Sequence, residues 1–155
     1  MQSPSVGKLS WTSNGVEVKP EALFSYFSLC APGLELVEEL TLREAIDFHF
    51  RFKKFFPGTE ARTLIEATGL QRAFDKPLAD FSSGMKQRVK LALAIFSDTP
   101  ALLLDEPCTN LDDAGVVQYR TWMDKYAPGR LVIVASNDAR EYEFCKHHIR
   151  LSVPA

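Results

Sequence analysis

Two short and almost wholly apolar segments, residues 101–105 (ALLLD) and 131–136 (LVIVAS), constrain the fold of this chain more than any other feature. A helical pattern over 113–126 lies between them, and another over 84–97 precedes the first. Near-continuous apolar strands that alternate with helices are typical of a parallel sheet with helices on both faces. A chain of 155 residues suits one domain with a sizeable core, so the sequence predicts one α/β domain.

Two adjacent carboxylates, Asp105 and Glu106, end the first of these strands and are followed by Pro107. In open α/β sheets, ligands bind at the carboxyl ends of the strands. An aspartate there can hold Mg²⁺, because magnesium favours one or two carboxylates together with phosphate oxygens. The adjacent glutamate can orient or deprotonate an attacking water. The alternative is that both carboxylates end the strand in a solvated turn.

Small polar residues stand at the start of the helix predicted over 84–97, in the sequence Ser82-Ser83-Gly84-Met85. Free backbone N–H groups and the positive end of a helix dipole form a phosphate-binding geometry. An ordinary serine N-cap is the alternative for Ser82. Asp112 and the Ser136-Asn137-Asp138 segment have the same alternative, since each leads from a strand toward a helix.

The first half of the chain has a different organisation, with short strands followed by a helical insert over 41–80. Thr41 and Glu44 have the spacing of a capping box, so a helix is expected to begin there. The helix that begins at Thr41 is expected to include Phe48, Phe52 and Phe55 and to end at Pro57-Gly58. Before it we expect strands over 7–13, 15–19 and 22–29, with a turn at Asn14-Gly15, and a loop over 30–40. The remaining expected elements are helices over 59–68 and 138–145 and a strand near 148–152.

These segments together resemble the ATP-binding cassette (ABC) family, the nucleotide-binding subunits of transporters. FSSGMKQR resembles the signature loop, ALLLDEP the Walker B strand, TNLD the D-loop, VIVASND the switch strand, CKHHIRL the closing strand, and CAPGLELVEELTLREAI the Q-loop passage. The resemblance implies a P-loop NTPase-like parallel sheet with a helical subdomain. It divides the chain into an N-terminal region (1–40), the helical subdomain (41–80) and a region from the signature helix to the switch strand (81–155).

The resemblance also implies the roles of the residues in ATP hydrolysis. Asp105 would support Mg²⁺, while Glu106 and Asn137 would be catalytic. Family members dimerise head to tail, so one cassette offers its signature loop to the ATP of the other. The residues expected to contact ATP are Ser82, Ser83, Gly84, Met85 and Asp112. The implied partners are a second cassette and a membrane-spanning permease.

Several positions depart from the family pattern. The phosphate loop G-x-x-x-x-G-K-[ST] does not occur in the sequence; the one Gly-Lys pair, Gly7-Lys8, is followed by Leu9. We expect this motif to lie before residue 1. The Q-loop glutamine is replaced by Ala31 or Pro32, and the switch histidine by Asn137, whose amide can still hydrogen-bond a phosphate. Ser83 and Met85 likewise replace a glycine and a glutamine.

The net charge of −2 gives no basic field, which argues against nucleic acid as a partner. No apolar run approaches the roughly 18 residues that cross a bilayer, and the N-terminus has no signal-peptide core. We therefore expect a cytoplasmic protein that reaches the inner face of the membrane through a permease. Lys53-Lys54 are expected at a solvated edge, with contact to a membrane partner as the alternative.

Three functions remain open from the sequence. The chain could be a transporter ATPase subunit, a non-catalytic cassette that lends its signature loop to a complete one, or a cassette protein of DNA repair or translation. The absent phosphate loop predicts weak Mg-ATP binding and no hydrolysis by the chain alone. The strand and helix that accompany this loop in the family would also be absent, so we expect an exposed apolar sheet surface and self-association.

Overall fold

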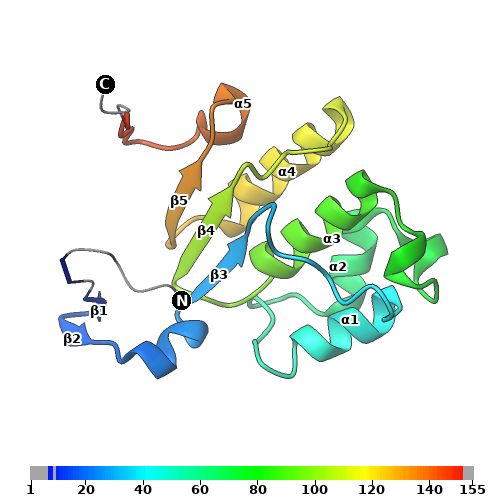
Figure 1. Ribbon diagram of the computed structural model, residues 1–155, viewed down its shortest axis with the longest axis horizontal. Helices are drawn as coiled ribbons and strands as arrows, with labels where there is room; N and C mark the ends of the chain where they lie inside the picture. The colour runs from blue at the N-terminus through cyan, green and yellow to red at the C-terminus, as the bar shows by residue number, and fades with distance from the viewer. Residues whose placement is uncertain (1–6, 9, 152–155) are drawn as a thin grey trace.

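The computed structural model describes residues 7, 8 and 10–151, and its centre is a parallel sheet of three strands (Figure 1). The strands are β3 (Phe27–Cys30), β4 (Ala101–Asp105) and β5 (Leu131–Ala135), in the order β3-β4-β5. Both pairings are parallel, which confirms the predicted α/β fold class. The expected strands over 101–105 and 131–136 agree with β4 and with β5, which ends one residue earlier.

The helices between the strands follow the predicted order. They are α1 (Leu42–His49), α2 (Ala61–Thr68), α3 (Ser83–Ile95), α4 (Asp113–Tyr126) and α5 (Ala139–Tyr142), with 3-10 helices η1 (Pro20–Ser25), η2 (Gln71–Ala73) and η3 (Leu78–Asp80). Figure 1 shows α1 to α4 together on one side of the strands. No helix in the described part of the chain is long and apolar enough to cross a membrane.

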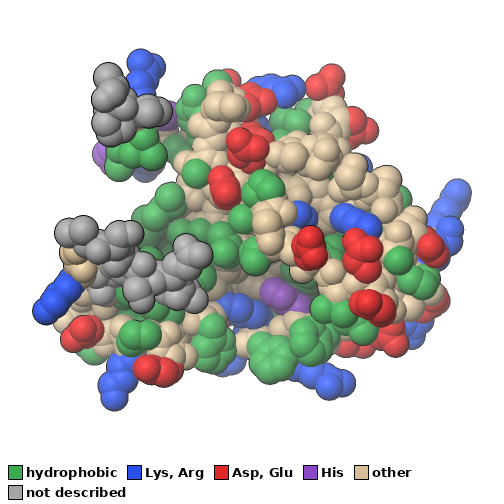
Figure 2. All heavy atoms as spheres, in the orientation of Figure 1, with side chains coloured by type: hydrophobic (Ala, Val, Ile, Leu, Met, Phe, Trp, Pro, Cys, Tyr) green, Lys and Arg blue, Asp and Glu red, His purple; other side chains and the backbone are tan. Residues whose placement is uncertain are grey.

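Burial alternates along each strand of the sheet, because successive side chains point to opposite faces. The register aligns Ser28 with Leu102, and Cys30 with Leu104, and these four side chains are all buried beneath the helices. The intervening residues are Leu29, Leu103, Leu131 and Ile133, of which Leu29, Leu131 and Ile133 are strongly exposed. We call this second surface the open face. Figure 2 shows hydrophobic side chains gathered over the strands, and the expected exposed apolar surface is confirmed.

The helical insert begins as predicted and ends differently. Thr41 and Glu44 form the complete capping box, with the Glu44 backbone N–H donating to Thr41 Oγ1 at 3.2 Å. The expected helix through Phe55 is wrong, because α1 ends at His49 and turns follow, with Phe55 in an isolated β-bridge to Ser97. Phe50 and Phe55 stack with ring centroids 3.5 Å apart, so packing of these rings replaces the helical spacing expected for Phe48, Phe52 and Phe55.

The two ends of the chain hold less strand than expected. Asn14 and Gly15 form a turn with positive φ between β1 (Thr12–Ser13) and β2 (Val16–Glu17), as predicted. The strand expected over 22–29 is shorter, because Pro20 starts the 3-10 helix η1 and β3 begins only at Phe27. The strand expected near 148–152 is wrong for residues 148–151, which form no strand. Leu9 and residue 152 lie outside the described residues.

Candidate functional site

The acidic pair and the switch position meet at one edge of the sheet. The parallel register places Asp105 opposite Ala135, and the Glu106 N–H donates to the Ala135 carbonyl at 2.9 Å. Asn137 follows two residues later, beyond the end of β5. The side chains of Asp105, Glu106 and Asn137 are all exposed. The fold thus brings the three residues from two strands to the same carboxyl edge, where α/β sheets bind ligands.

Glu106 has an unusual backbone for a residue with a long side chain. Its φ is 42°, in the left-handed region, which costs on the order of 1 kcal/mol for residues other than glycine. The Thr109 N–H donates to the Glu106 carbonyl at 3.1 Å and closes a turn around this conformation. Strained backbone of this kind persists only where the surrounding contacts hold it, and it occurs often at functional sites.

The signature-like segment forms the start of α3. Ser82 is the N-cap, and its Oγ accepts from the Met85 N–H at 3.2 Å, so the capping alternative is confirmed for this hydroxyl. Ser82 and Ser83 are exposed, which leaves the helix start open to a ligand. A Cβ at Gly84 would lie 2.8 Å from the Asn110 carbonyl oxygen. Gly84 is therefore needed for the close approach of α3 to the loop after Glu106, whatever its role toward phosphate.

The signature-like residues and the acidic pair belong to different parts of the hydrogen-bond network of the described residues. Within the part of the chain that the structure describes, no hydrogen bond joins residues 82–85 to Asp105, Glu106 or Asn137. The acidic pair lies at the end of β4, whereas residues 82–85 reach the loop after it only at Asn110. The chain carries two sets of candidate residues with no hydrogen bond between them, and their service to two ATP sites stays a prediction.

Asp112 and Asp138 both act as helix caps. Asp112 Oδ1 accepts from the Gly115 N–H at 2.8 Å at the start of α4, and Asp138 Oδ1 accepts from the Arg140 N–H at 2.9 Å. The Arg140 guanidinium also contacts Asp138, which lowers the pKa of that carboxyl below its ordinary value. The capping alternative is confirmed for both aspartates, and any contact of Asp112 with ATP stays a prediction.

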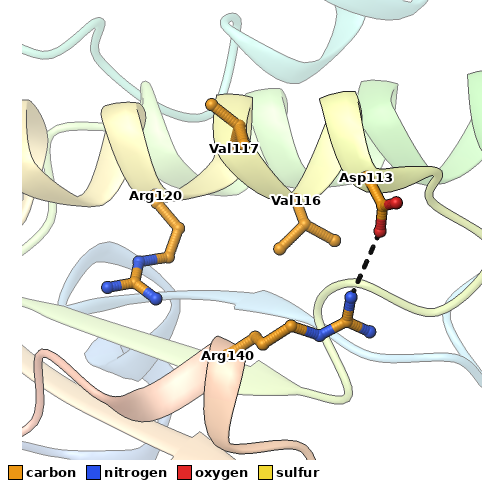
Figure 3. A pocket seen from close by; sticks show the side chains of 5 residues that line it. All are labelled: Asp113, Val116, Val117, Arg120 and Arg140. Carbon is orange, nitrogen blue, oxygen red and sulfur yellow. Dashed lines mark hydrogen bonds and ion pairs between the residues drawn. The ribbon is translucent and has the colours of Figure 1, made fainter.

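A shallow pocket of about 320 Å³ lies between α4 and α5 (Figure 3). Figure 3 shows Arg140 extending from α5 toward Asp113 at the start of α4, with 3.3 Å between Nη1 and Oδ1. Arg120 of α4 pairs with Glu143 at 2.6 Å. Both pairs are exposed, so each adds little to stability, but they hold the segment after Asn137 against α4.

Two buried polar side chains near the acidic pair were not identified as functional by the sequence. Gln87 belongs to the signature-like segment, and Glu141 lies in the helix expected over 138–145. The Glu141 carboxylate instead turns inward and accepts from the Cys108 N–H at 2.7 Å. Burial and this carboxylate raise the pKa of the Cys108 thiol to about 12. The sequence around Gln87 and Glu141 does not indicate their contacts, because their partners, Pro107 and Cys108, lie far away in the chain.

A larger groove of about 760 Å³ lies beside β3 and the loop after it. It is mainly apolar and also contains His49 and Lys53 from the helical insert. Lys53 Nζ donates to the Phe27 carbonyl at 2.7 Å and to the Phe24 carbonyl, and burial lowers the pKa of its amine. The expectation of a solvated Lys53 is therefore wrong, since its charge is satisfied by backbone oxygens. Lys54 is exposed as expected.

The exposed Asp105 carboxylate fits a Mg²⁺ ion, because oxygen donors at an open strand end suit this metal. The exposed start of the helix α3, thirteen residues long, fits a phosphate group. A parallel sheet with paired carboxylates at its carboxyl edge, beside a helix with a Ser-Ser-Gly start, defines the chain as an α/β protein of the P-loop NTPase class without the phosphate loop itself.

Comparison with known proteins identifies the family. A family model described as "ABC transporter" matches residues 3–109. The uncharacterized ABC transporter ATP-binding protein YcbN of Bacillus subtilis is 34% identical over 83 residues, and the bacitracin transport ATP-binding protein BcrA of Enterococcus faecalis is 35% identical over 81 residues. These alignments cover 54% and 51% of this chain but 27% and 26% of the relatives. The chain belongs to the ABC transporter family, and it spans about a quarter of the length of these curated relatives.

Solved structures agree with the family. An ATP-binding subunit of an ABC transporter is 26% identical, with a TM-score of 0.66 over 79% of this chain and 54% of that one. The dimeric structure of MJ0796, a bacterial ABC transporter cassette, is 18% identical, with a TM-score of 0.72 over 92% of this chain and 68% of that one. At this low identity the second likeness shows the fold alone, and it confirms the P-loop NTPase-like class.

Proposed function

We propose that this chain acts as the ATP-binding subunit of an ABC transporter, which couples Mg-ATP hydrolysis to transport across a membrane. The meeting of Asp105, Glu106 and Asn137 at one carboxyl edge is the observation that carries this proposal. The side chains of these three residues are exposed at the end of the strands, so they add nothing to the packing of the sheet core. The names of the two relatives, an ATP-binding protein and a transport ATP-binding protein, support the same function.

Each residue of the acidic edge has a distinct role in this proposal. Asp105 would support Mg²⁺, which when bound neutralises charge on the phosphate oxygens. Glu106 would orient the attacking water and accept its proton. The Asn137 amide would donate to the terminal phosphate, but unlike histidine it cannot carry a charge. The left-handed backbone of Glu106 supports its assignment as the residue next to the reacting water.

The signature-like segment would serve a second cassette. The exposed start of α3 would offer backbone N–H groups to an ATP held by that partner. The separation of residues 82–85 from Asp105 and Glu106 supports this division of roles. The dimeric state of the related MJ0796 cassette adds a precedent for two cassettes acting together.

A membrane-spanning permease is the second proposed partner, and the groove beside β3 is the surface we assign to it. The groove is large enough for part of a helix, with an apolar lining that includes Leu34 and Leu36. Lys90 adds positive charge to it, which would favour a helix that carries an acidic residue. Through this partner the chain would lie at the cytoplasmic side of the membrane.

The phosphate loop is the one part of this mechanism that the printed sequence does not supply. The site therefore requires a phosphate loop contributed by sequence beyond these residues or by another polypeptide. For the chain by itself we expect weak or undetectable binding of Mg-ATP, measured by calorimetry. Micromolar affinity would contradict the assignment of the phosphates to the absent loop.

The decisive experiment joins a family phosphate-loop segment to residue 1 and measures ATP hydrolysis. Glu106→Gln should lower turnover by roughly 10²–10⁴-fold while ATP stays bound, because the amide keeps the shape and loses the basic carboxylate. Asp105→Asn should instead raise the Mg²⁺ concentration that is required. Glu60→Gln, which also removes one exposed carboxylate but at the start of α2 in the helical insert, is the matched control and should change neither property.

Two outcomes would contradict the proposal in different ways. Full activity of Glu106→Gln would show that the acidic pair only ends a strand in a polar turn. No hydrolysis by the extended parent chain, together with stimulation of a complete cassette through residues 82–85, would support a non-catalytic partner instead. Loss of that stimulation in Ser82→Ala would locate the contact at the start of α3.

A further inference from the structure

A single peptide unit just after Glu106 is held at both of its polar atoms by buried side chains. Its carbonyl belongs to Pro107, and Gln87 Nε2 donates to this oxygen at 2.7 Å. Its N–H belongs to Cys108 and donates to Glu141 Oε1 at 2.7 Å. Because the peptide is planar, two hydrogen bonds at opposite ends fix both its position and its rotation.

Burial makes these two contacts strong. Gln87 is 2% exposed and Glu141 is 4% exposed, and Cys108 is also buried. A hydrogen bond in a buried site is stronger than the same bond in water, and water cannot replace it where it has no access. Loss of either side chain would leave a buried carbonyl or N–H without a partner, so the loop has no equally good second position.

The two side chains come from the two segments that flank the proposed ATP sites. Gln87 lies three residues after Gly84 in α3, and its Nε2 also approaches Cys30 Sγ at the end of β3, at 3.7 Å. Glu141 lies in α5, four residues after Asn137. Its backbone carbonyl accepts from the Tyr119 hydroxyl at 2.8 Å. The Pro107–Cys108 peptide is thus the point where α3, β4 and α5 meet.

We propose that Gln87 and Glu141 are positioning residues that set the conformation of Glu106 through the Pro107–Cys108 peptide. Rotation of this peptide would change ψ of Pro107, and because the proline ring fixes φ of Pro107, the change would pass through the Glu106–Pro107 peptide to Glu106, whose φ is already in the left-handed region. A shift of α3 or α5 would move Glu106 by the same route. The role in hydrolysis rests on the proposed function, whereas the control of the Glu106 conformation does not.

A packing role alone makes a different prediction from a positioning role. If the two side chains only stabilise the core, their removal lowers the free energy of unfolding and affects all of β4 alike. If they position Glu106, the change concentrates in residues 106–109, and a side chain that preserves the same hydrogen bond restores it. Glutamine at position 141 tests this, because its Oε1 can still accept from the Cys108 N–H.

Nuclear magnetic resonance on the full chain without nucleotide tests the conformational part. In Glu141→Ala, the Cys108 amide should exchange with solvent roughly 10–100-fold faster, and the Glu106 Cα and Thr109 amide signals should shift. Glu141→Gln should keep the parent signals of Glu106. Glu60→Gln, which changes an exposed carboxylate at the start of α2 that makes no capping hydrogen bond, is the matched control and should change none of them.

Gln87→Met provides a second route if Glu141→Ala does not fold, because methionine has a similar shape but no N–H donor. It should shift the same Glu106 and Thr109 signals while the amides of the β4–β5 ladder keep their protection. Unchanged Glu106 signals in Gln87→Met, or an equal loss of protection throughout β4, would overturn the proposal.

The chain extended with a phosphate-loop segment tests the catalytic part. Glu141→Ala and Gln87→Met should lower kcat with little change in KM, and Glu141→Gln should recover most of the parent kcat. If the extended parent does not hydrolyse ATP, the proposed function fails while the resonance experiment still decides the conformational part. Parent kcat in a variant whose Glu106 signals have shifted would overturn the catalytic part alone.

Discussion

The two faces of the sheet carry similar side chains in very different surroundings. On the face beneath the helices, Ser28, Cys30, Leu102 and Leu104 are buried. On the open face, Leu29 is 41% exposed, Ile133 51% and Leu131 60%. Composition alone does not distinguish the two faces, because apart from Ser28 the side chains named on both are apolar. The strands of a parallel sheet are usually apolar on both faces because both faces are covered by other elements. Here the described residues cover one face only.

The acidic edge shows the opposite situation. Its backbone geometry is held from three directions, by β5 at Glu106, by α3 at Pro107 and by α5 at Cys108. The open face has no comparable set of contacts within the described residues. The chain therefore combines a firmly held acidic edge with a sheet surface that is free to bind a further element of structure.

Alanine substitutions of matched leucines should separate the two faces most clearly. Leu102→Ala should lower the free energy of unfolding by about 2–5 kcal/mol, because it removes buried methyl groups and leaves a cavity beneath the helices. Leu131→Ala removes the same atoms from the open face, and we expect less than about 1 kcal/mol. Urea unfolding of both variants measures the difference.

The m-value provides the control for this comparison, since similar m-values mean that both variants unfold from equally compact states. Equal losses of stability in the two variants would mean that the open face is covered in solution, by self-association or by another part of the chain. Repeating the measurement at lower protein concentration would then distinguish self-association from cover by another part of the chain, because only self-association depends on concentration.

Acid should weaken the helical side of the molecule through His49. Burial and the nearby Lys53 charge lower the pKa of this imidazole from 6.5 to about 4. Ser97 Oγ donates to the Leu93 carbonyl, so the neutral His49 donates through Nε2 to Ser97 Oγ, at 2.9 Å. The unfolded chain takes up this proton first. The stability that neutral His49 contributes is therefore complete above about pH 6.5 and is lost as the pH falls toward 4.

The expected loss over this interval is about 2–3 kcal/mol, from a pKa difference worth about 1.4 kcal/mol per unit. Urea unfolding at several pH values between 4 and 7 measures it. His49→Gln keeps a donor for Ser97 and removes the titrating group, so its stability should vary less with pH by that amount. An identical pH dependence in both proteins would assign the acid sensitivity to carboxylates such as Glu44, whose contacts with Thr41 lower its pKa.

The sequence predicted well those features that depend on local chemistry. The capping box at Thr41, the strand ending in Asp105 and the helix over 113–126 each follow from residues close together in the chain. The end of α1 at His49 was missed because stacking of Phe50 on Phe55 competes with helical spacing.

Contacts between distant segments account for the other differences. Glu141 and Cys108 are 33 residues apart, and Gln87 and Pro107 are 20 apart, so no local pattern indicates either pair. Which face of β4 is covered likewise depends on the direction of the crossovers through α3 and α4. A sequence with apolar residues on both faces does not contain that information.

A charged residue on the open face should have the smallest effect on the stability of the chain. It should have a clear effect on self-association. Ile133→Lys should change the free energy of unfolding by only about 0.5 kcal/mol, because the side chain is half exposed. It should nevertheless weaken self-association, since a lysine on the edge strand β5 opposes both strand pairing and apolar contact. Val117→Lys adds the same charge at an exposed position of α4. It is the matched control and should associate like the parent. Sedimentation velocity over a range of concentrations measures this, and a parent chain that stays monomeric throughout would show that exposure of the open face alone does not drive association.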